Sequence, residues 1–569
     1  MFGVLLGGKL IYLQLFMHGH YLVQAEQDQT RKYEIPATRG QIYTNDNGVA
    51  QPLALNQTLY VIYADPSQMK DRAVETKQLA GILGGSADDY LTSVSKATRY
   101  VELATRIPTT TANNIKALHL PGVGTTSRDY RTYPEGSLAA QVLGFVNADG
   151  AGQYGIEGYL NQNLTGTPGL FAAKTDTNGI PIQESSNIAK KPVDGISYVL
   201  TIDKNVQAEV EKELAAQVQN VKAKSGSVVI LDPSNGKVVS MANYPTYDPN
   251  NYQAVTDYRD FANNVVSSAY EPGSTVKALT YGTGLDQSKI TPDTTYNDPG
   301  FYTIDGYKVA DAFGDVPGPN RTMTYALKLS LNTGAMYVLR TLSGSTEKFT
   351  LDGKKTLFNY FTNHFGLGVL TGIEQASEAS GNVNQPSNAA GNDVNYANMT
   401  FGQGMTVTMI QMATAMASIA NGGKLYQPTV IDGTLNSDGT IKEQAPKLIR
   451  SNVLSAQAAA QLNTMLQVTV HHGTGYIAAE QNAGYVLAGK TGSAQIPKPD
   501  GSGYIDGANI GSFLGYAPAN NPKFVMMIRI DQPLNAGFAE TTTVPLFSSL
   551  STWLFKYYAI PPSGSYPDK

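Results

Sequence analysis

The sequence of 569 residues contains no cysteine and only six histidines. Without cysteine, the chain cannot form disulfide bonds, use a thiol nucleophile or bind a metal through thiolates. The histidines are scattered, and only His471 and His472 are adjacent, so we expect no metal site and no cofactor. The net charge of -5 offers no basic surface, which argues against a nucleic-acid partner.

Long apolar runs are scarce, and one of them opens the chain. Residues 1–17, MFGVLLGGKLIYLQLFM, are mostly apolar but include Lys9 and Gln14. As a helix the run would span about 25 Å, less than the roughly 30 Å of membrane hydrocarbon. It also lacks the small-residue cleavage site of a secretory signal. We interpret it as the outer part of an uncleaved membrane anchor; the alternative is a buried helix of a soluble domain.

The length predicts two or three domains, and KKPVDG at 190–195 marks a boundary. Residues 18–195 mix short alternating strands with charged helical segments. From residue 196 the pattern changes to an amphipathic helix with Asp203 as its N-cap, two β-hairpins at 227–243 and 510–531, and a C-terminal helix. Helices on both sides of an antiparallel sheet predict an α+β fold.

A serine and a lysine stand one helical turn apart in EPGSTVKALTYGTGL. Their i, i+3 spacing puts Ser274 and Lys277 on one helix face, ahead of an uncharged run that we expect to be buried. Burial favours the neutral amine, which could take a proton from the serine hydroxyl. The same S-x-x-K spacing recurs in turns and polar segments, where no buried helix follows, at Ser67, Ser93, Ser234 and Ser345. Only Ser274 is therefore a candidate nucleophile.

Two further motifs follow downstream. SLN at Ser330–Asn332 supplies a hydroxyl and an amide that could reach the same cavity. KTGS at Lys490–Ser493 comes after an apolar run that resembles a strand, and Gly492 leaves room for another backbone to approach. A lysine and two hydroxyls beside a strand edge suit a substrate carboxylate. Each motif is weak evidence alone.

The ordered set S-x-x-K, S-x-N and K-T-G is characteristic of penicillin-binding proteins and serine β-lactamases. The chain resembles a class B penicillin-binding protein along nearly its whole length. PATRGQIYTNDNG at 36–48 resembles the membrane-proximal R-G-x-I-x-D-x-N-G segment of that family, and GQYGIEGYLNQNLTG at 152–166 resembles its G-x-x-G-[IL]-E segment. The resemblance implies an elongated pedestal (dimerisation-type) domain at 18–195 and a transpeptidase domain of the serine β-lactamase-like fold at 196–569.

The resemblance also implies a peptidoglycan D,D-transpeptidase that works through a serine acyl-enzyme. Ser274 would attack the carbonyl of the penultimate D-Ala of a stem peptide, with Lys277 as base. Ser330 would relay the proton to the leaving amine, and Asn332 would position Lys277 and the substrate amide. The oxyanion hole would consist of the backbone N–H groups of Ser274 and Ser493. The substrate carboxylate would be held by the KTGS segment, Lys490, Thr491, Gly492 and Ser493.

Location and partners follow from the same resemblance. We expect a single-pass protein of the cytoplasmic membrane, with its catalytic domain on the extracytoplasmic side. Expected partners are peptidoglycan stem peptides, β-lactam antibiotics, a membrane glycosyltransferase and other division or cell-wall synthesis proteins. The modest pedestal favours a division-type enzyme over an elongation-type one.

The sequence departs from the family pattern at three places. Ser493 stands where threonine is common, Leu331 is the middle residue of S-x-N, and Asn45–Gly48 replaces the usual D-R-N-G. None of these changes removes a catalytic group, although the last removes an arginine.

Other functions of the same fold remain as alternatives. A class A β-lactamase would be about half this length, and a bifunctional penicillin-binding protein would need a glycosyltransferase domain with paired glutamates. A β-lactam sensor or idle scaffold would lack one of the catalytic residues, and all are present here. A stable penicillin adduct would distinguish a transpeptidase from a β-lactamase.

Overall fold

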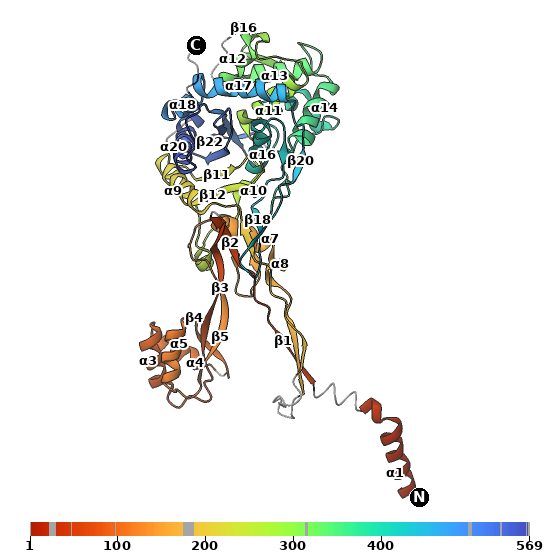
Figure 1. The fold of residues 1–569 in the computed structure, drawn as a ribbon, viewed down its shortest axis with the longest axis vertical. Helices are drawn as coiled ribbons and strands as arrows, with labels where there is room; N and C mark the ends of the chain where they lie inside the picture. The colour runs from red at the N-terminus through yellow and green to blue at the C-terminus, as the bar shows by residue number, and fades with distance from the viewer. Residues whose placement is uncertain are drawn as a thin grey trace. The chain divides into compact units, whose positions relative to one another are not determined.

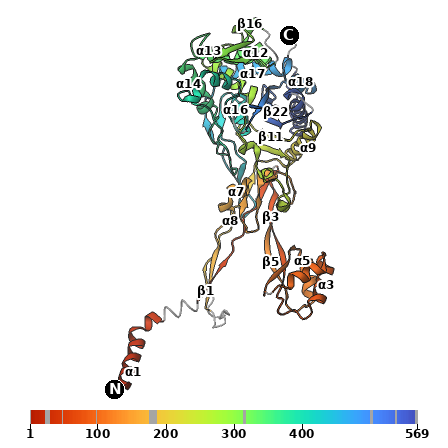
Figure 2. The same ribbon diagram turned by 180° about the vertical axis from the view of Figure 1, so that it is seen from behind.

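The structure is a computed structural model that describes residues 2–21, 30–46, 48–96, 98–174, 187–312, 317–498, 503–534, 538–564 and 566. The chain divides into two compact units. One consists of Met1–Gln51 with Ser137–Lys569, and the other of Pro52–Gly136. The ribbon is shown in Figure 1 and, from behind, in Figure 2.

The smaller unit is a three-stranded antiparallel sheet with helices. Strand β3 (Val49–Ala64) enters it and pairs with both β4 (Val101–Ile107) and β5 (Val123–Thr132). Its helices are α3 (Arg72–Leu83), α4 (Ala87–Val94) and α5 (Thr109–Ala117). Apolar side chains of the sheet and of two helices form a small core, Ile62, Leu79, Ala112 and Ile115.

The first helix is short. Helix α1 (Phe2–Ile11) continues into a π-helical turn, Tyr12–Phe16, and its side chains Leu5, Leu6, Leu10 and Ile11 are exposed. Among the residues that the structure describes, no helix has both the length and the apolar character needed to cross a membrane.

The five-stranded sheet of the larger unit has the antiparallel order β12-β11-β23-β22-β21. Its strands are β11 (Ser225–Leu231), β12 (Val238–Tyr244), β21 (Ala488–Pro497), β22 (Tyr504–Ala517) and β23 (Phe524–Asp531). The two predicted hairpins therefore lie side by side, and β21 is one of the two edge strands.

Helices cover both faces of this sheet (Figures 1 and 2). One face packs against α9 (Lys204–Asn220) and α20 (Val544–Tyr557), which share a large apolar core with β11, β22 and β23. Asp203 caps α9 as predicted, because its side chain accepts hydrogen bonds from two backbone N–H groups. The other face carries α16 (Met409–Ala420), and α17 (Ala456–His472) packs against both α16 and α11 (Lys277–Asp286). The predicted α+β fold is confirmed.

A second sheet joins distant parts of the chain. Strand β10 (Tyr198–Leu200) pairs in parallel with β2 (Ile42–Asp46) and antiparallel with β18 (Ile431–Leu435). Strand β19 (Ile441–Glu443) pairs antiparallel with β18. Residues before and after position 195 thus share one hydrogen-bonded ladder.

The two N-terminal motifs meet in an ion pair. The Arg39 guanidinium donates to Oε2 of Glu157 from Nε at 2.9 Å and from Nη2 at 2.6 Å, and its Nη1 donates to Asn161 and Thr165. The Glu157 side chain is fully buried. Beside it, a side chain at Gly40 would collide with the backbone of Ile196, so the glycine permits close contact between the two segments.

The remaining elements complete the two units. Smaller strands pair as β1 (Thr30–Ile35) with β8 (Gly169–Lys174), β8 with β9 (Asn187–Lys190), β6 (Phe145–Val146) with β7 (Gly152–Gln153), β13 (Thr295–Asp298) with β16 (Gly318–Thr322), β14 (Phe301–Ile304) with β15 (Tyr307–Ala310), and β17 (Leu425–Tyr426) with β20 (Leu448–Arg450). The other helices include α6 (Ala140–Leu143), α7 (Gly155–Tyr159), α8 (Asn161–Thr165), α10 (Asn264–Ser267), α12 (Met323–Lys328), α13 (Asn332–Leu342), α14 (Leu351–Asn359), α15 (Asp393–Met399), α17 (Ala456–His472), α18 (Tyr476–Gln481) and α19 (Ala539–Thr542).

Candidate active site

Ser274 lies in a 3-10 turn, Gly273–Val276, that leads directly into α11. Gly273 has a φ of +56°, and a Cβ there would come within 2.8 Å of the Ser493 carbonyl oxygen. Glycine therefore allows the turn both its left-handed backbone and its approach to β21. The half-buried Ser274 side chain lines a cavity of about 460 Å³.

Lys277 is the first residue of α11 and is fully buried. Its Nζ donates to the carbonyl oxygen of Ser330 at 2.5 Å and to Oγ of Ser330 at 3.2 Å. Burial and the nearby charge of Lys490 hold the pKa of Lys277 well below its ordinary value, although Asp311 opposes the shift. A neutral amine at neutral pH can accept a proton from a hydroxyl.

The S-x-N segment sits at the start of α13. Ser330 is buried and has a φ of +58°, and Asn332 lines the cavity while its side-chain amide donates to the carbonyl of Ala310 at 2.7 Å. The backbone N–H groups of Asn332 and Thr333 both donate to Asp311, at 2.5 and 3.0 Å. Asp311 thereby fixes the helix start, and the sequence interpretation had not included it.

The KTGS segment belongs to the edge strand β21. Lys490 is fully buried, donates to the carbonyl of Thr491 at 2.9 Å, and burial lowers its pKa to about 7. Thr491 shares a hydrogen bond of 2.6 Å with Thr474. A Cβ at Gly492 would lie 2.9 Å from the Thr275 side chain, so this glycine lets the Ser274 turn pack against the strand.

Glu271, also missing from the sequence interpretation, ties three segments together near Ser274. The carboxylate accepts the N–H of Gly404 at 2.8 Å and the hydroxyl of Tyr504 on β22 at 3.2 Å. The side chain is largely buried, and burial raises its pKa. Because its partners are far away in sequence, no local pattern could have identified this role.

All three motifs meet at one cavity. Ser274, Asn332 and Ser493 line it directly. Lys277 and Ser330 are joined by hydrogen bonds in the adjoining wall, and Lys490 and Thr491 are buried in the edge strand. Other lining residues are apolar or amide side chains and small residues, including Ala310, Phe401, Gln403, Gln495, Ile505, Asn509 and Phe538. A nucleophile, a buried amine and a cation beside an edge strand suit acyl transfer from a carboxylate-bearing peptide.

Two family models match the chain. The family model of the penicillin binding protein transpeptidase domain matches residues 226–550, and that of the penicillin-binding protein dimerisation domain matches residues 34–200. Stage V sporulation protein D of Bacillus subtilis is 31% identical, over 95% of this chain and 82% of its own. Peptidoglycan D,D-transpeptidase FtsI of Escherichia coli K12 is 29% identical over 98% of this chain and 90% of its own length.

Solved structures agree with this assignment. Penicillin binding protein 3 of Mycobacterium tuberculosis, crystallised with aztreonam, has a TM-score of 0.71 and 27% identity, covering 94% of this chain and all of that one. Penicillin binding protein 2X of Streptococcus thermophilus has a TM-score of 0.74 at 23% identity, which supports the fold alone. With a dimerisation domain ahead of a transpeptidase domain, the chain belongs to the class B penicillin-binding proteins.

Proposed function

We propose that this protein is a serine D,D-transpeptidase that cross-links peptidoglycan stem peptides. The observation that carries the proposal is that Ser274, Asn332 and Ser493, one residue from each motif, line one cavity, with the buried amine of Lys277 hydrogen-bonded to Ser330 in the adjoining wall. The names of the relatives, among them D,D-transpeptidases from two bacteria, support it.

In the proposed reaction, Oγ of Ser274 attacks the carbonyl carbon of the penultimate D-Ala and gives its proton to Nζ of Lys277. The backbone N–H groups of Ser274 and Ser493 stabilise the negative oxygen of the tetrahedral intermediate. The proton then passes through Ser330 to the departing D-Ala amine, because Ser330 Oγ is 3.2 Å from Lys277 Nζ. An amine of a second stem peptide takes the acyl group and restores Ser274.

Asn332 has a different contact from the one expected for it. Its amide N–H donates to Ala310, on the segment that also contains Asp311. We propose that Asn332 positions the substrate with its remaining amide groups, since it lines the cavity. Its effect on Lys277 would pass through the backbone of Ser330–Asn332, because the carbonyl of Ser330 accepts a hydrogen bond from Lys277.

Intact mass after incubation with a penicillin tests the proposal. We expect a stable adduct of one penicillin per chain, and no adduct on the Ser274→Ala variant. Rapid hydrolysis of penicillin without an accumulated adduct would instead indicate a β-lactamase. Full acylation of Ser274→Ala would show that another residue is the nucleophile.

Lys490→Met is expected to weaken acylation by penicillin by about 10- to 100-fold, because a hydrogen bond to a charged group contributes about 1.5–3 kcal/mol. Methionine keeps the volume and removes a buried charge, so the melting temperature should not fall. Since Lys490 has a pKa of about 7, the second-order acylation rate of the parent should decline as pH rises through 7. The variant should lack this decline. An unchanged pH profile in Lys490→Met would contradict carboxylate binding by Lys490.

Attachment to the cytoplasmic membrane belongs to the same proposal. Supporting it, several large apolar side chains among residues 2–16 are more than half exposed, Leu5, Leu6, Leu10, Ile11, Leu15 and Phe16. We propose that this segment is part of a single-pass anchor and that the catalytic domain lies on the extracytoplasmic side. Deleting residues 1–17 should release a soluble, folded protein that still reacts with penicillin. Loss of folding on deletion would contradict the anchor.

A division-type role, with a membrane glycosyltransferase as partner, is the most specific part of the proposal. The relatives named FtsI and stage V sporulation protein D support it. A fluorescent fusion of the full chain should collect at division septa. Uniform labelling of the lateral wall would favour an elongation role instead.

A further inference from the structure

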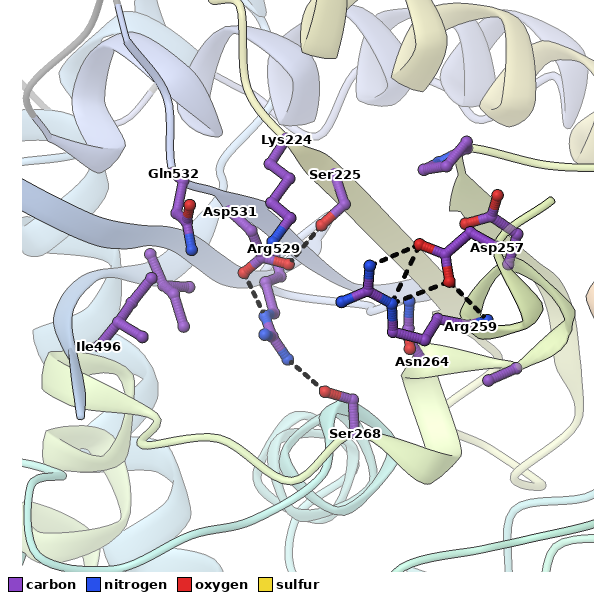
Figure 3. A pocket seen from close by; sticks show the side chains of 14 residues that line it. Lys224, Ser225, Asp257, Arg259, Asn264, Ser268, Ile496, Arg529, Asp531 and Gln532 are labelled. Carbon is purple, nitrogen blue, oxygen red and sulfur yellow. Dashed lines mark hydrogen bonds and ion pairs between the residues drawn. The ribbon is translucent and has the colours of Figure 1, made fainter. Parts of the chain in front are cut away.

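A second cavity of about 460 Å³ borders the five-stranded sheet, but its charges are already balanced (Figure 3). Three cationic and three acidic side chains line it, Lys224, Arg259, Arg529, Asp257, Asp260 and Asp531. Figure 3 shows Arg259 joined to Asp257 and Arg529 joined to Asp531. Arg529 belongs to β23, two strands in from β21. A polar contact that does reach the KTGS segment comes instead from the loop between α17 and α18.

This loop, Gly473–Gly475, brings a threonine against β21. Oγ1 of Thr474 lies 2.6 Å from Oγ1 of Thr491, and the two hydroxyls share a hydrogen bond. Within the part of the chain that the structure describes, the Thr474 side chain has no other hydrogen-bond partner. Helix α17 itself packs against β21, which keeps the loop close to the strand.

The two glycines of the loop allow this placement. A Cβ at Gly473 would lie 2.6 Å from the carbonyl oxygen of Lys328, two residues before Ser330. A Cβ at Gly475 would lie 3.0 Å from Cα of Val470, in the last turn of α17. The loop therefore packs both against the segment that leads into the S-x-N motif and against its own helix, and the threonine between the glycines is held from two sides.

Thr491 is the residue through which Thr474 can act on a substrate. Residues two apart on a strand point to the same face, so the Thr491 side chain lies on the face of β21 that carries Ser493. Ser493 lines the cavity beside Ser274. The shared hydrogen bond thus lies next to the proposed carboxylate site.

The number of protons in this contact decides what it can do. A threonine hydroxyl donates one hydrogen bond and can accept two. Nζ of Lys490 donates to Oγ1 of Thr491 at 3.4 Å, which occupies one acceptor position. If Thr474 donates to the other position, the Thr491 proton is left for a ligand. If Thr491 donates to Thr474 instead, its proton is already used.

A carboxylate selects between these two arrangements. It can only accept hydrogen bonds, so its arrival favours the arrangement in which Thr474 donates to Thr491 and Thr491 donates to the carboxylate. Hydrogen bonds in such a chain polarise one another. The hydroxyl of Thr491 therefore binds an anion more tightly with Thr474 behind it than alone.

We propose that Thr474 is a positioning residue for the substrate carboxylate: its hydroxyl donates to Thr491 and directs the Thr491 proton toward the end of the stem peptide. The inference rests on the proposed function, in which the KTGS segment holds that carboxylate. It gives the loop Gly473–Gly475 a part in distinguishing a negatively charged substrate end from a neutral one.

The test compares acylation of the full chain by benzylpenicillin, which carries a carboxylate, with acylation by its methyl ester, which does not. The measured quantity is the ratio of the two second-order rates, followed by intact mass. For the parent the ratio should exceed about 10, because the ester loses hydrogen bonds to a charged group. Thr474→Val keeps the shape without the hydroxyl and should lower the ratio about 2- to 10-fold, the range for one neutral hydrogen bond. Thr474→Ser keeps the hydroxyl and should restore the ratio.

Two further comparisons show how Thr474 acts. Thr464→Val removes an exposed hydroxyl of α17 that bonds to the Ala460 carbonyl of its own helix, and it should keep the parent ratio. Thr491→Val should lower the ratio by itself. Adding Thr474→Val to it should lower the ratio no further, because two residues that act through one contact are not additive.

The other outcomes decide against the inference. A parent-like ratio in Thr474→Val, or no recovery in Thr474→Ser, would overturn it. Equal slowing of the penicillin and its ester would also overturn it, because the loop would then act only through the fold. If Thr474→Val does not fold, Thr474→Ala applies the same test with a smaller side chain. Failure of the proposed function looks different: the parent would form no adduct with either compound, or would react equally with both.

Discussion

Lys277→Ala is expected to slow acylation of Ser274 by penicillin by about 100- to 10,000-fold, the usual contribution of a general base. The amine is fully buried, and burial and the charge of Lys490 hold its pKa well below the ordinary value, which favours the neutral form that can accept the serine proton. Acylation rates with one fluorescent penicillin measure the effect.

Ser493→Ala provides the comparison on the same assay. It removes one hydroxyl from the proposed carboxylate site but keeps the backbone N–H of the proposed oxyanion hole. A loss of about 1.5–3 kcal/mol corresponds to roughly 10- to 100-fold. Lys277→Ala should therefore be the slower variant, once circular dichroism has shown that both are folded. Equal rates for the two variants, or near-parent acylation by Lys277→Ala, would show that Lys277 is not the base.

Arg39→Ala is expected to cost about 3–5 kcal/mol of unfolding free energy, because it removes the guanidinium that pairs with the buried Glu157 carboxylate. The effect should appear as a lower midpoint of thermal unfolding, followed by calorimetry. The control Lys212→Ala breaks an exposed ion pair within α9 and should leave the midpoint unchanged. Because Arg39 lies outside the catalytic cavity, the folded variant should still be acylated at Ser274. An unchanged midpoint in Arg39→Ala would mean that the pair contributes nothing to stability.

Local sequence patterns predicted much of the catalytic domain. The alternation in residues 227–243 and 510–531 corresponds to two adjacent hairpins of one sheet, and Asp203 caps the helix that its position indicated. Such features depend on neighbours within a few residues, so propensity and periodicity reveal them. The three motifs meet because the helices and the strand that carry them pack together. The family resemblance implied this meeting, whereas the spacing of the motifs along the sequence did not.

Contacts between distant segments could not be predicted in this way. Asp311 lies 21 positions before Asn332, whose N–H it accepts, and Glu271 binds Tyr504, which is 233 positions away. Asn45, at the departure from the family pattern, donates to Asp432 at 2.8 Å. Each partner is a common polar residue without a repeating pattern around it. Only the folded backbone specifies which of many such residues come together.

The ladder formed by β2, β10 and β18 has a mechanical consequence. Strand β18 is preceded by Thr429, which forms a bridge with Lys237 beside β12, so an unbroken series of backbone hydrogen bonds joins residues 42–44 to the catalytic sheet. A pull along β2 would load the three-residue parallel pairing with β10 in shear, with its hydrogen bonds sharing the force instead of opening one at a time. Tension on the N-terminal strands would therefore be borne by the base of the catalytic domain, without a flexible hinge at residue 195 to absorb it.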